Sequence, residues 1–164
     1  MQIERVLVPV DFSDCSTAAV DYGAFLGREL GAQIDVLHVW SPPAELAHMM
    51  RDLTVTDPEG RKGALAEVIR TWAGRKLKEA LQRLEDEGVG GVRGRLAEGV
   101  PHRTIVEVAD DGYDLVVMGT HGRTGLSRTL MGSVAERVVR RSPVPVLTVR
   151  RPAWATRASA SPAA

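Results

Sequence analysis

The residues best suited to chemistry lie in one glycine-rich segment, residues 119–133, with the sequence GTHGRTGLSRTLMGS. Gly119 and Gly122 permit tight turns and a close approach of the backbone to a ligand. Gly132 and Ser133 stand where a helix is predicted to begin, and the first turn of a helix offers free N–H groups and the positive end of the helix dipole. The spacing therefore predicts a loop that binds an anion.

Side chains near this loop fit the same interpretation. Arg123 and Arg128 would add positive charge beside a bound anion, and His121 lies inside the loop as a candidate ligand contact. Asp11 directly follows the first apolar run, and its carboxylate is an acceptor suited to a ribose hydroxyl or a metal-bound water. No metal ligand is assigned, because the histidines do not share an element at ligand spacing.

Short apolar runs alternate with helix-like segments along most of the chain. Strands are predicted at about residues 3–10, 33–39, 92–97, 114–118 and 144–149, and helices at about residues 14–30, 59–87, 101–109 and 132–141. Such alternation implies βαβ units with right-handed crossovers and a parallel sheet. The predicted fold is α/β: a single doubly wound, Rossmann-like domain with a five-stranded parallel sheet of order 3-2-1-4-5.

Further expectations concern individual segments. Ser13 or Asp14 caps the first helix, whose apolar face is predicted to contain Ala18, Tyr22, Phe25 and Leu26. Three prolines in residues 40–58 predict a mobile loop. Residues 1–150 form the predicted domain, and residues 151–164, which are poor in apolar side chains, are predicted to be a disordered tail.

This topology would bring the candidate residues together. Ligands of open α/β sheets bind beyond the carboxyl ends of the strands, at the point where the strand order reverses. If the first and fourth strands are neighbours, Asp11 and Gly119 end at the same crevice.

Composition excludes several classes of protein. The 164 residues carry 21 basic and 21 acidic side chains, a balance that argues against nucleic acid as a partner. Cys15 is the only cysteine, so no intrachain disulfide can form. The N-terminus lacks the build of a signal peptide, and no stretch approaches the roughly 20 apolar residues of a membrane span. The expected location is the cytoplasm.

The glycine-rich segment matches a known signature: glycine, two residues, glycine, nine residues, glycine, then serine or threonine. Gly119, Gly122, Gly132 and Ser133 fill its fixed positions. With the opening VLVPVDFSD, the runs VLHV and DLVVMG and the ending GSVAERVVRRSPVPVLTVR, the chain resembles the nucleotide-binding branch of the universal stress protein family over residues 1–150.

The resemblance implies that the ligand is ATP, with Mg²⁺ as a candidate companion ion. It implies phosphate contacts from Gly122, Gly132, Ser133 and the backbone of Val134, a ribose contact from Asp11, an adenine contact near Val39, and Met118 with Gly119 beside the sugar and base. Pro9, Val10, His121 and Arg123 complete the predicted set. Some nucleotide-binding members carry threonine at the position of Val10, so that hydroxyl is absent here.

Catalysis is expected to be weak at most, and no catalytic residue is assigned. No lysine follows Lys78, so phosphoryl transfer lacks its usual lysine clamp. Three functions stay open: an ATP-binding regulatory or stress-response protein, a slow ATPase or sensor of AMP or cyclic AMP, and an interaction module without nucleotide. The resemblance also implies a homodimer joined through the fifth strand, residues 144–149, whose apolar edge invites pairing.

Overall fold

The structure is a computed structural model that describes residues 2–40, 53–56, 60, 62–121 and 131–150. The predicted tail, residues 151–164, lies outside the described residues. So do Gly122, Arg123 and Arg128 of the glycine-rich segment, and most of the predicted loop at residues 40–58.

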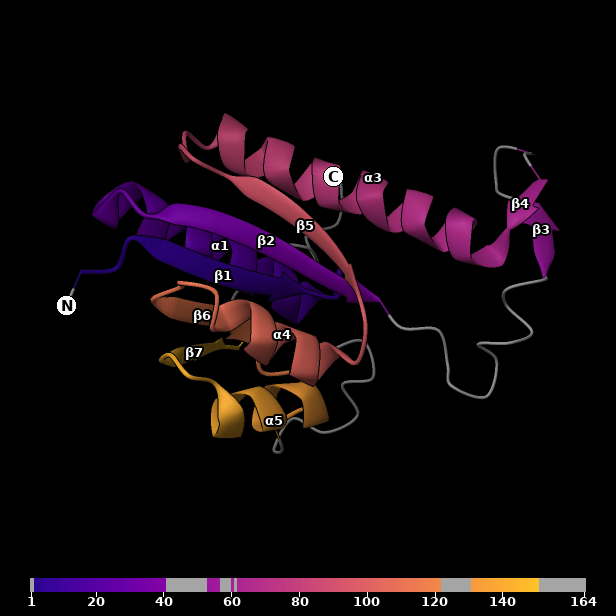
Figure 1. Cartoon of the computed structure of the whole chain (residues 1–164). Coiled ribbons are helices and arrows are strands. Elements are labelled where there is room, and N and C mark those ends of the chain that lie inside the picture. The colour runs from indigo at the N-terminus through magenta and orange to yellow at the C-terminus, as the bar shows by residue number, and fades with distance from the viewer. Residues whose placement is uncertain (1, 41–52, 57–59, 61, 122–130, 151–164) are drawn as a thin grey trace, which may run out of the picture.

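Five parallel strands form the central sheet (Figure 1). They are β1 (Arg5–Val10), β2 (Gln33–Trp40), β5 (Arg93–Glu98), β6 (Leu115–Gly119) and β7 (Val146–Val149), in the spatial order β5-β2-β1-β6-β7. Counted along the chain, this order is 3-2-1-4-5, so the predicted topology is confirmed. The central strands are rich in valine and buried on both faces, as expected for strands covered by helices on two sides.

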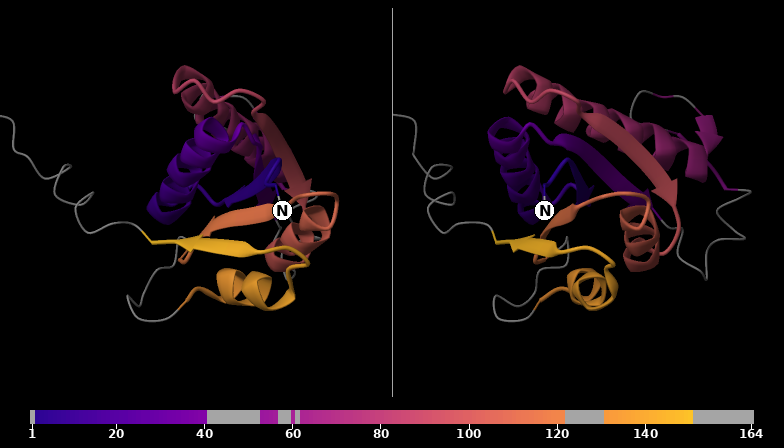
Figure 2. Two further views of the ribbon diagram at one scale, coloured as in Figure 1. Left: turned by 90° about the vertical axis from the view of Figure 1, so that its left-hand side faces the viewer. Right: turned by 60° about the vertical axis from the view of Figure 1, so that its left-hand side comes forward.

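Two layers of helix cover the sheet (Figure 2). The helices are α1 (Asp14–Leu30), α3 (Leu65–Asp86), α4 (Pro101–Ala109) and α5 (Ser133–Arg141). Alternate residues of β1 point to opposite faces: Val6 and Val8 pack in the core that includes residues of α1 and α3, and Leu7 packs in the core that includes residues of α4 and α5. The fold is therefore doubly wound.

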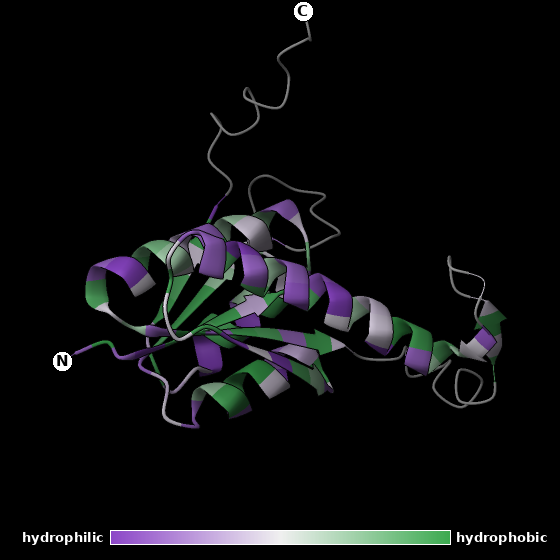
Figure 3. Ribbon diagram, turned by 90° about the horizontal axis from the view of Figure 1, so that it is seen from above, coloured by the Kyte–Doolittle hydropathy of each residue, from purple (hydrophilic) through white to green (hydrophobic). Residues whose placement is uncertain are grey.

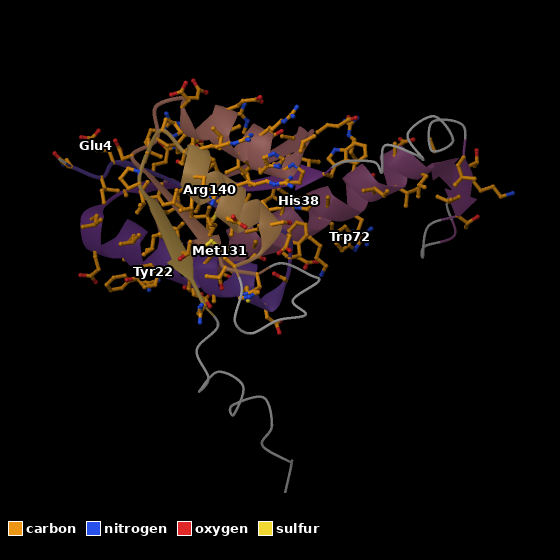
Figure 4. All side chains as sticks on the ribbon, turned by 90° about the horizontal axis from the view of Figure 1, so that it is seen from below. Glu4, Tyr22, His38, Trp72, Met131 and Arg140 are labelled. Atoms are coloured by element: carbon orange, nitrogen blue, oxygen red, sulfur yellow. The ribbon has the colours of Figure 1, made fainter. Side chains whose placement is uncertain are left out.

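The predicted bounds of α1 are confirmed, but its predicted apolar face is only partly right: Leu26 packs against the core, whereas Tyr22 and Phe25 do not. Ser13 caps the helix by accepting a hydrogen bond from the Ser16 N–H, and Gly31 ends it in the left-handed conformation with φ of 68°. The buried face instead consists of small residues, namely Ser16, Ala19, Val20, Gly23, Ala24 and Gly27. Tyr22 is 42% exposed and Phe25 is 46% exposed, and Figure 4 shows Tyr22 at the outer surface.

The region between β2 and α3 also differs from the prediction. Trp40 is the last residue of β2 rather than part of a loop, and β3 (Thr54–Thr56) pairs antiparallel with β4 (Lys62–Ala64). The helix predicted from residue 59 therefore begins only at Leu65. Gly60, with φ of 83°, lies between the two strands, and β-branched threonine favours the strand over the helix.

The hairpin and the first turns of α3 extend beyond the end of the sheet (Figure 1). The second half of α3 returns over the sheet and buries Ala73, Leu77 and Leu84. Its outer face is hydrophilic, whereas the strands beneath are apolar (Figure 3). Burial of this apolar stripe, rather than helix propensity, holds α3 against the sheet.

Candidate functional site

A cavity of about 310 Å³ opens at the carboxyl end of the sheet, where the strand order reverses between β1 and β6. Every predicted site residue that the structure describes lines it: Pro9, Val10, Asp11, Val39, Met118, Gly119, His121, Gly132, Ser133 and Val134. The predicted meeting of the two strand ends in one crevice is therefore observed.

Six further residues line the same cavity: Ser16, Leu37, Pro101, Ile105, Thr120 and Ala135. Pro101 and Ile105 come from α4, whose first turn reaches the cavity although it is far from the glycine-rich segment in the sequence. The sequence predicted this helix, and because the helix follows β5 its first turn must lie at the carboxyl edge of the sheet; this rule could have identified Pro101 as a lining residue. Thr120 lies inside the signature at a position that the signature leaves free.

Asp11 is held in a defined orientation at the end of β1. Its Oδ1 atom accepts hydrogen bonds from the Ser13 N–H at 3.1 Å and from the Ser13 Oγ–H at 2.6 Å. Ser13 is in turn held at the start of α1, because its carbonyl accepts a hydrogen bond from the Thr17 N–H at 2.9 Å. The carboxylate is thus positioned by the helix that follows it.

The first turn of α5 supplies hydrogen-bond donors to the cavity. The Gly132 N–H is already used, because it donates to the Thr120 carbonyl at 2.8 Å and so joins the end of β6 to the start of α5. In the part of the chain that the structure describes, neither the Ser133 N–H nor the Val134 N–H is paired with an acceptor. These donors, with the helix dipole behind them, have the chemistry that binds an anion at a helix N-terminus.

His121 adds a polar atom to this end of the cavity. Its Nδ1 and the Thr120 hydroxyl share a hydrogen bond at 2.9 Å. Its Nε2 is buried and finds no partner among the described residues. A buried polar atom normally has a partner, so this nitrogen is available to a ligand in the cavity.

Gly119 is required by packing as well as by its place in the cavity. A Cβ atom built there would lie 2.9 Å from the backbone carbonyl carbon and oxygen of Cys15. The first turn of α1 therefore packs directly on the end of β6, and a side chain at Gly119 would push the two elements apart. This contact brings Asp11 on the α1 side close to the start of the glycine-rich segment.

The rest of the cavity wall is apolar. Leu37 and Val39 come from β2, Ile105 from α4 and Met118 from β6. Leu37 and Met118 are buried, whereas Val39 is half-buried. An apolar wall with polar groups at one end suits a ligand that combines a flat ring system with an anionic group.

The other described histidines have structural roles. His38 is buried beside Val10, whose carbonyl lies 2.8 Å from the His38 Nδ1 atom, and its ring stacks on Phe12 with centroids 4.4 Å apart. His102 is buried on α4. Burial, and then the positive charges of Arg137 and Arg141, lower the pKa of His102 and favour its neutral form.

The described ranges contain neither a metal-binding cluster nor a membrane-spanning helix. No cluster of three or more histidine, cysteine, aspartate or glutamate side chains could hold a metal ion there. None of the helices described is long and apolar enough to span a membrane.

The fold is that of a doubly wound α/β protein, and its cavity lies at the topological switch point of the sheet. A model of the universal stress protein family matches residues 2–150, and the chain belongs to that family. It is 33% identical to the universal stress protein MJ0531 of Methanocaldococcus jannaschii over 150 residues, which span 91% of this chain and 83% of that protein.

Solved structures support the same assignment. The structure of MJ0577, a universal stress protein of the same archaeon, matches with a TM-score of 0.76 at 30% identity and covers 93% of this chain and 99% of that chain. A universal stress protein in complex with cyclic AMP matches with a TM-score of 0.60 at 28% identity, covering 91% and 98% of the two chains.

Proposed function

We propose that this protein binds ATP in the cavity at the carboxyl end of the sheet and acts in the cytoplasm as a stress-response regulatory or signalling module. The observation that carries the proposal is the pair of N–H groups at Ser133 and Val134, which have no acceptor among the described residues and belong to residues that line the same cavity as Asp11. One pocket therefore contains N–H donors suited to phosphate and a carboxylate acceptor suited to ribose hydroxyls.

Each part of the ligand has a matching surface. The phosphates lie at the start of α5, where N–H groups bonded to charged oxygens contribute about 1.5–3 kcal/mol each. The ribose hydroxyls donate to Asp11, and the adenine ring packs against Val39 and the apolar wall. The predicted contacts from Gly122 and Arg123 belong to the same phosphate site. Mg²⁺, where bound, enters with the triphosphate.

Hydrolysis is proposed to be slow or negligible. The chain has no lysine after Lys78, and the phosphate site uses backbone N–H groups and His121. Binding without efficient turnover is the behaviour of a regulatory module, whose output depends on occupancy of the site.

A second candidate is a slow ATPase or a sensor of AMP or cyclic AMP, which is favoured by the complex of a family member with cyclic AMP. Native mass spectrometry of freshly purified protein tests whether any nucleotide is retained. Competition with AMP and cyclic AMP, and a time course of ATP hydrolysis, then separate the two candidates. A cavity that retains and binds no nucleotide leaves the third function, a dimeric interaction module.

Gly132→Leu is the sharpest test of the site. Gly132 has φ of −63° and ψ of 147°, a conformation that any residue adopts, so the backbone tolerates the change. A side chain on the rim of the phosphate site should weaken ATP binding at least about a hundredfold, equivalent to about 2.7 kcal/mol. Calorimetric titration measures the affinity.

The matched control is Gly90→Leu, at a position before β5 with open space around its Cβ. It should leave ATP affinity unchanged. Circular dichroism should show the same fold for both variants. Unaltered binding in a folded Gly132→Leu protein contradicts the proposed phosphate site.

A further inference from the structure

The turn between β1 and α1 joins a proposed ligand contact to a helix cap through one side chain. Ser13 has a single hydroxyl proton, and that proton is donated to Asp11 Oδ1 at 2.6 Å. The Ser13 hydroxyl oxygen also accepts the Ser16 N–H at 3.3 Å as the cap of α1. The bond to the carboxylate is the shorter of the two, and charge-assisted hydrogen bonds of this length are the stronger class.

The backbone of this turn is held in an unusual conformation. Phe12, between Asp11 and Ser13, has φ of 63°, which is rare for a bulky residue. Its ring contacts the His38 ring and meets the Trp72 ring edge-on, with centroids 5.5 Å apart. Such strained residues persist only where their surroundings hold them, and they cluster at ligand sites. Here the left-handed conformation of Phe12 reverses the chain, so that Ser13 can donate two hydrogen bonds to the Asp11 carboxylate.

Capping alone does not explain this arrangement. A cap needs only an acceptor for the Ser16 N–H, and Ser13 uses its donor on Asp11 in addition. Two donors from one residue, the N–H and the hydroxyl, meet the same carboxylate oxygen. They fix the plane of the carboxylate before any ligand arrives, and preorganisation of this kind lowers the cost of binding.

We infer that Ser13 is a positioning residue for nucleotide recognition, which orients the Asp11 carboxylate toward the ribose hydroxyls. The inference rests on the proposed function. It predicts that Ser13 affects the part of the binding free energy that depends on the ribose hydroxyls and leaves the contributions of the adenine and the phosphates alone.

The test compares ATP with 2′,3′-dideoxy-ATP, which has the same base and phosphates without the ribose hydroxyls. Ser13→Gly removes the hydroxyl while glycine still serves as a helix cap. Because the hydroxyl bond to Oδ1 is lost while the Ser13 N–H bond stays, ATP binding should weaken about three- to tenfold, and binding of the dideoxy analogue by less than about twofold. Calorimetric titration gives both affinities.

Three further variants sharpen the result. Thr17→Ala removes a hydroxyl that also bonds Ser13, through its carbonyl, but does not touch Asp11, so both affinities should stay unchanged. Ser13→Thr keeps the hydroxyl and should restore ATP binding. In an Asp11→Ala background, which lacks the oxygen that Ser13 orients, Ser13→Gly should add no further loss.

Different outcomes test the role of Ser13, the ribose contact of Asp11 and nucleotide binding separately. Equal weakening for ATP and the dideoxy analogue means that Ser13 acts only through the helix, and overturns the inference. Equal affinity of the wild-type protein for both nucleotides overturns the ribose role of Asp11 and the inference with it. A wild-type protein that binds neither nucleotide overturns the proposed function itself.

Discussion

Asp35 shows how single residues stabilise the end of the sheet away from the cavity. It is only 6% exposed on β2, and its carboxylate accepts the Tyr113 hydroxyl proton at 2.5 Å and lies 3.5 Å from the Arg5 guanidinium. Arg5 also lies over the Tyr113 ring, 4.3 Å from its centroid. A buried carboxylate is tolerable only with such partners.

Tyr113→Phe should destabilise the protein by about 1–3 kcal/mol, because the buried Asp35 carboxylate loses a donor. Burial and the bond to Asp35 raise the pKa of Tyr113 from 10.0 to about 12. The folded state therefore keeps the phenol proton to a higher pH than the unfolded chain, and wild-type stability should fall as pH rises from about 10 to about 12. Urea unfolding at a series of pH values measures both effects.

The exposed Tyr22 provides the control, since Tyr22→Phe should change stability by less than about 0.5 kcal/mol. The Tyr113→Phe variant should also lack the alkaline loss of stability that the Tyr113 phenol causes in the wild-type protein. A Tyr113→Phe protein as stable as wild type at neutral pH would show that Arg5 and Gln33 alone satisfy Asp35.

At the scale of elements, α1 packs through its small residues rather than its large ones. A Cβ built at Gly23 would lie 2.9 Å from a Val8 methyl group, and one at Gly27 would lie 2.8 Å from a Val89 methyl group. The helix therefore approaches the sheet more closely than any larger side chain would allow. Tyr22 and Phe25 point away, with their rings 5.8 Å apart.

One substitution at two helical glycines tests this packing. Gly27→Ala should destabilise the folded protein by about 1–3 kcal/mol, because the cost of overpacking exceeds the gain from the better helix propensity of alanine. Gly74→Ala, in α3, meets open space and should stabilise by about 0.5–1 kcal/mol. Thermal unfolding of the two variants checks the contrast. Equal stabilisation at both positions would mean that the α1 contact relaxes without cost.

At the scale of the whole molecule, β7 is an edge strand, paired only with β6 in the part of the chain that the structure describes. The carbonyls of Pro145 and Val149 accept the N–H groups of Val116 and Thr120. Because backbone groups alternate along a parallel strand, the N–H and C=O of Thr148 point to the open edge. Edge strands of this kind pair with another chain unless they are covered.

We propose that two copies pair through this edge, and predict a mass of twice 17.7 kDa by sedimentation at micromolar concentration. Thr148→Pro, which removes an outward N–H, should give a monomer, whereas Thr148→Val keeps that donor and should stay dimeric. A monomeric wild-type protein refutes this assembly.

Local sequence patterns predicted the features that are specified by short stretches of the chain, namely individual strands, helices and the glycine-rich signature. Short apolar runs and helical periodicity predicted the five strands of the main sheet, and the doubly wound fold class supplied their order. The signature at Gly119, Gly132 and Ser133 predicted residues that line one cavity. These features follow from the sequence because each is specified by neighbours in the chain and by rules that relate one βαβ unit to the next.

Contacts between distant segments were decided only by the tertiary structure. The buried face of α1 depends on how closely it approaches β1 and Val89, and apolar periodicity carries no information on that distance. The hydrogen bond from the Gly132 N–H to the Thr120 carbonyl likewise depends on how two segments are placed in space. Periodicity identifies which residues are apolar, but the fit of their shapes against another element determines which of them are buried.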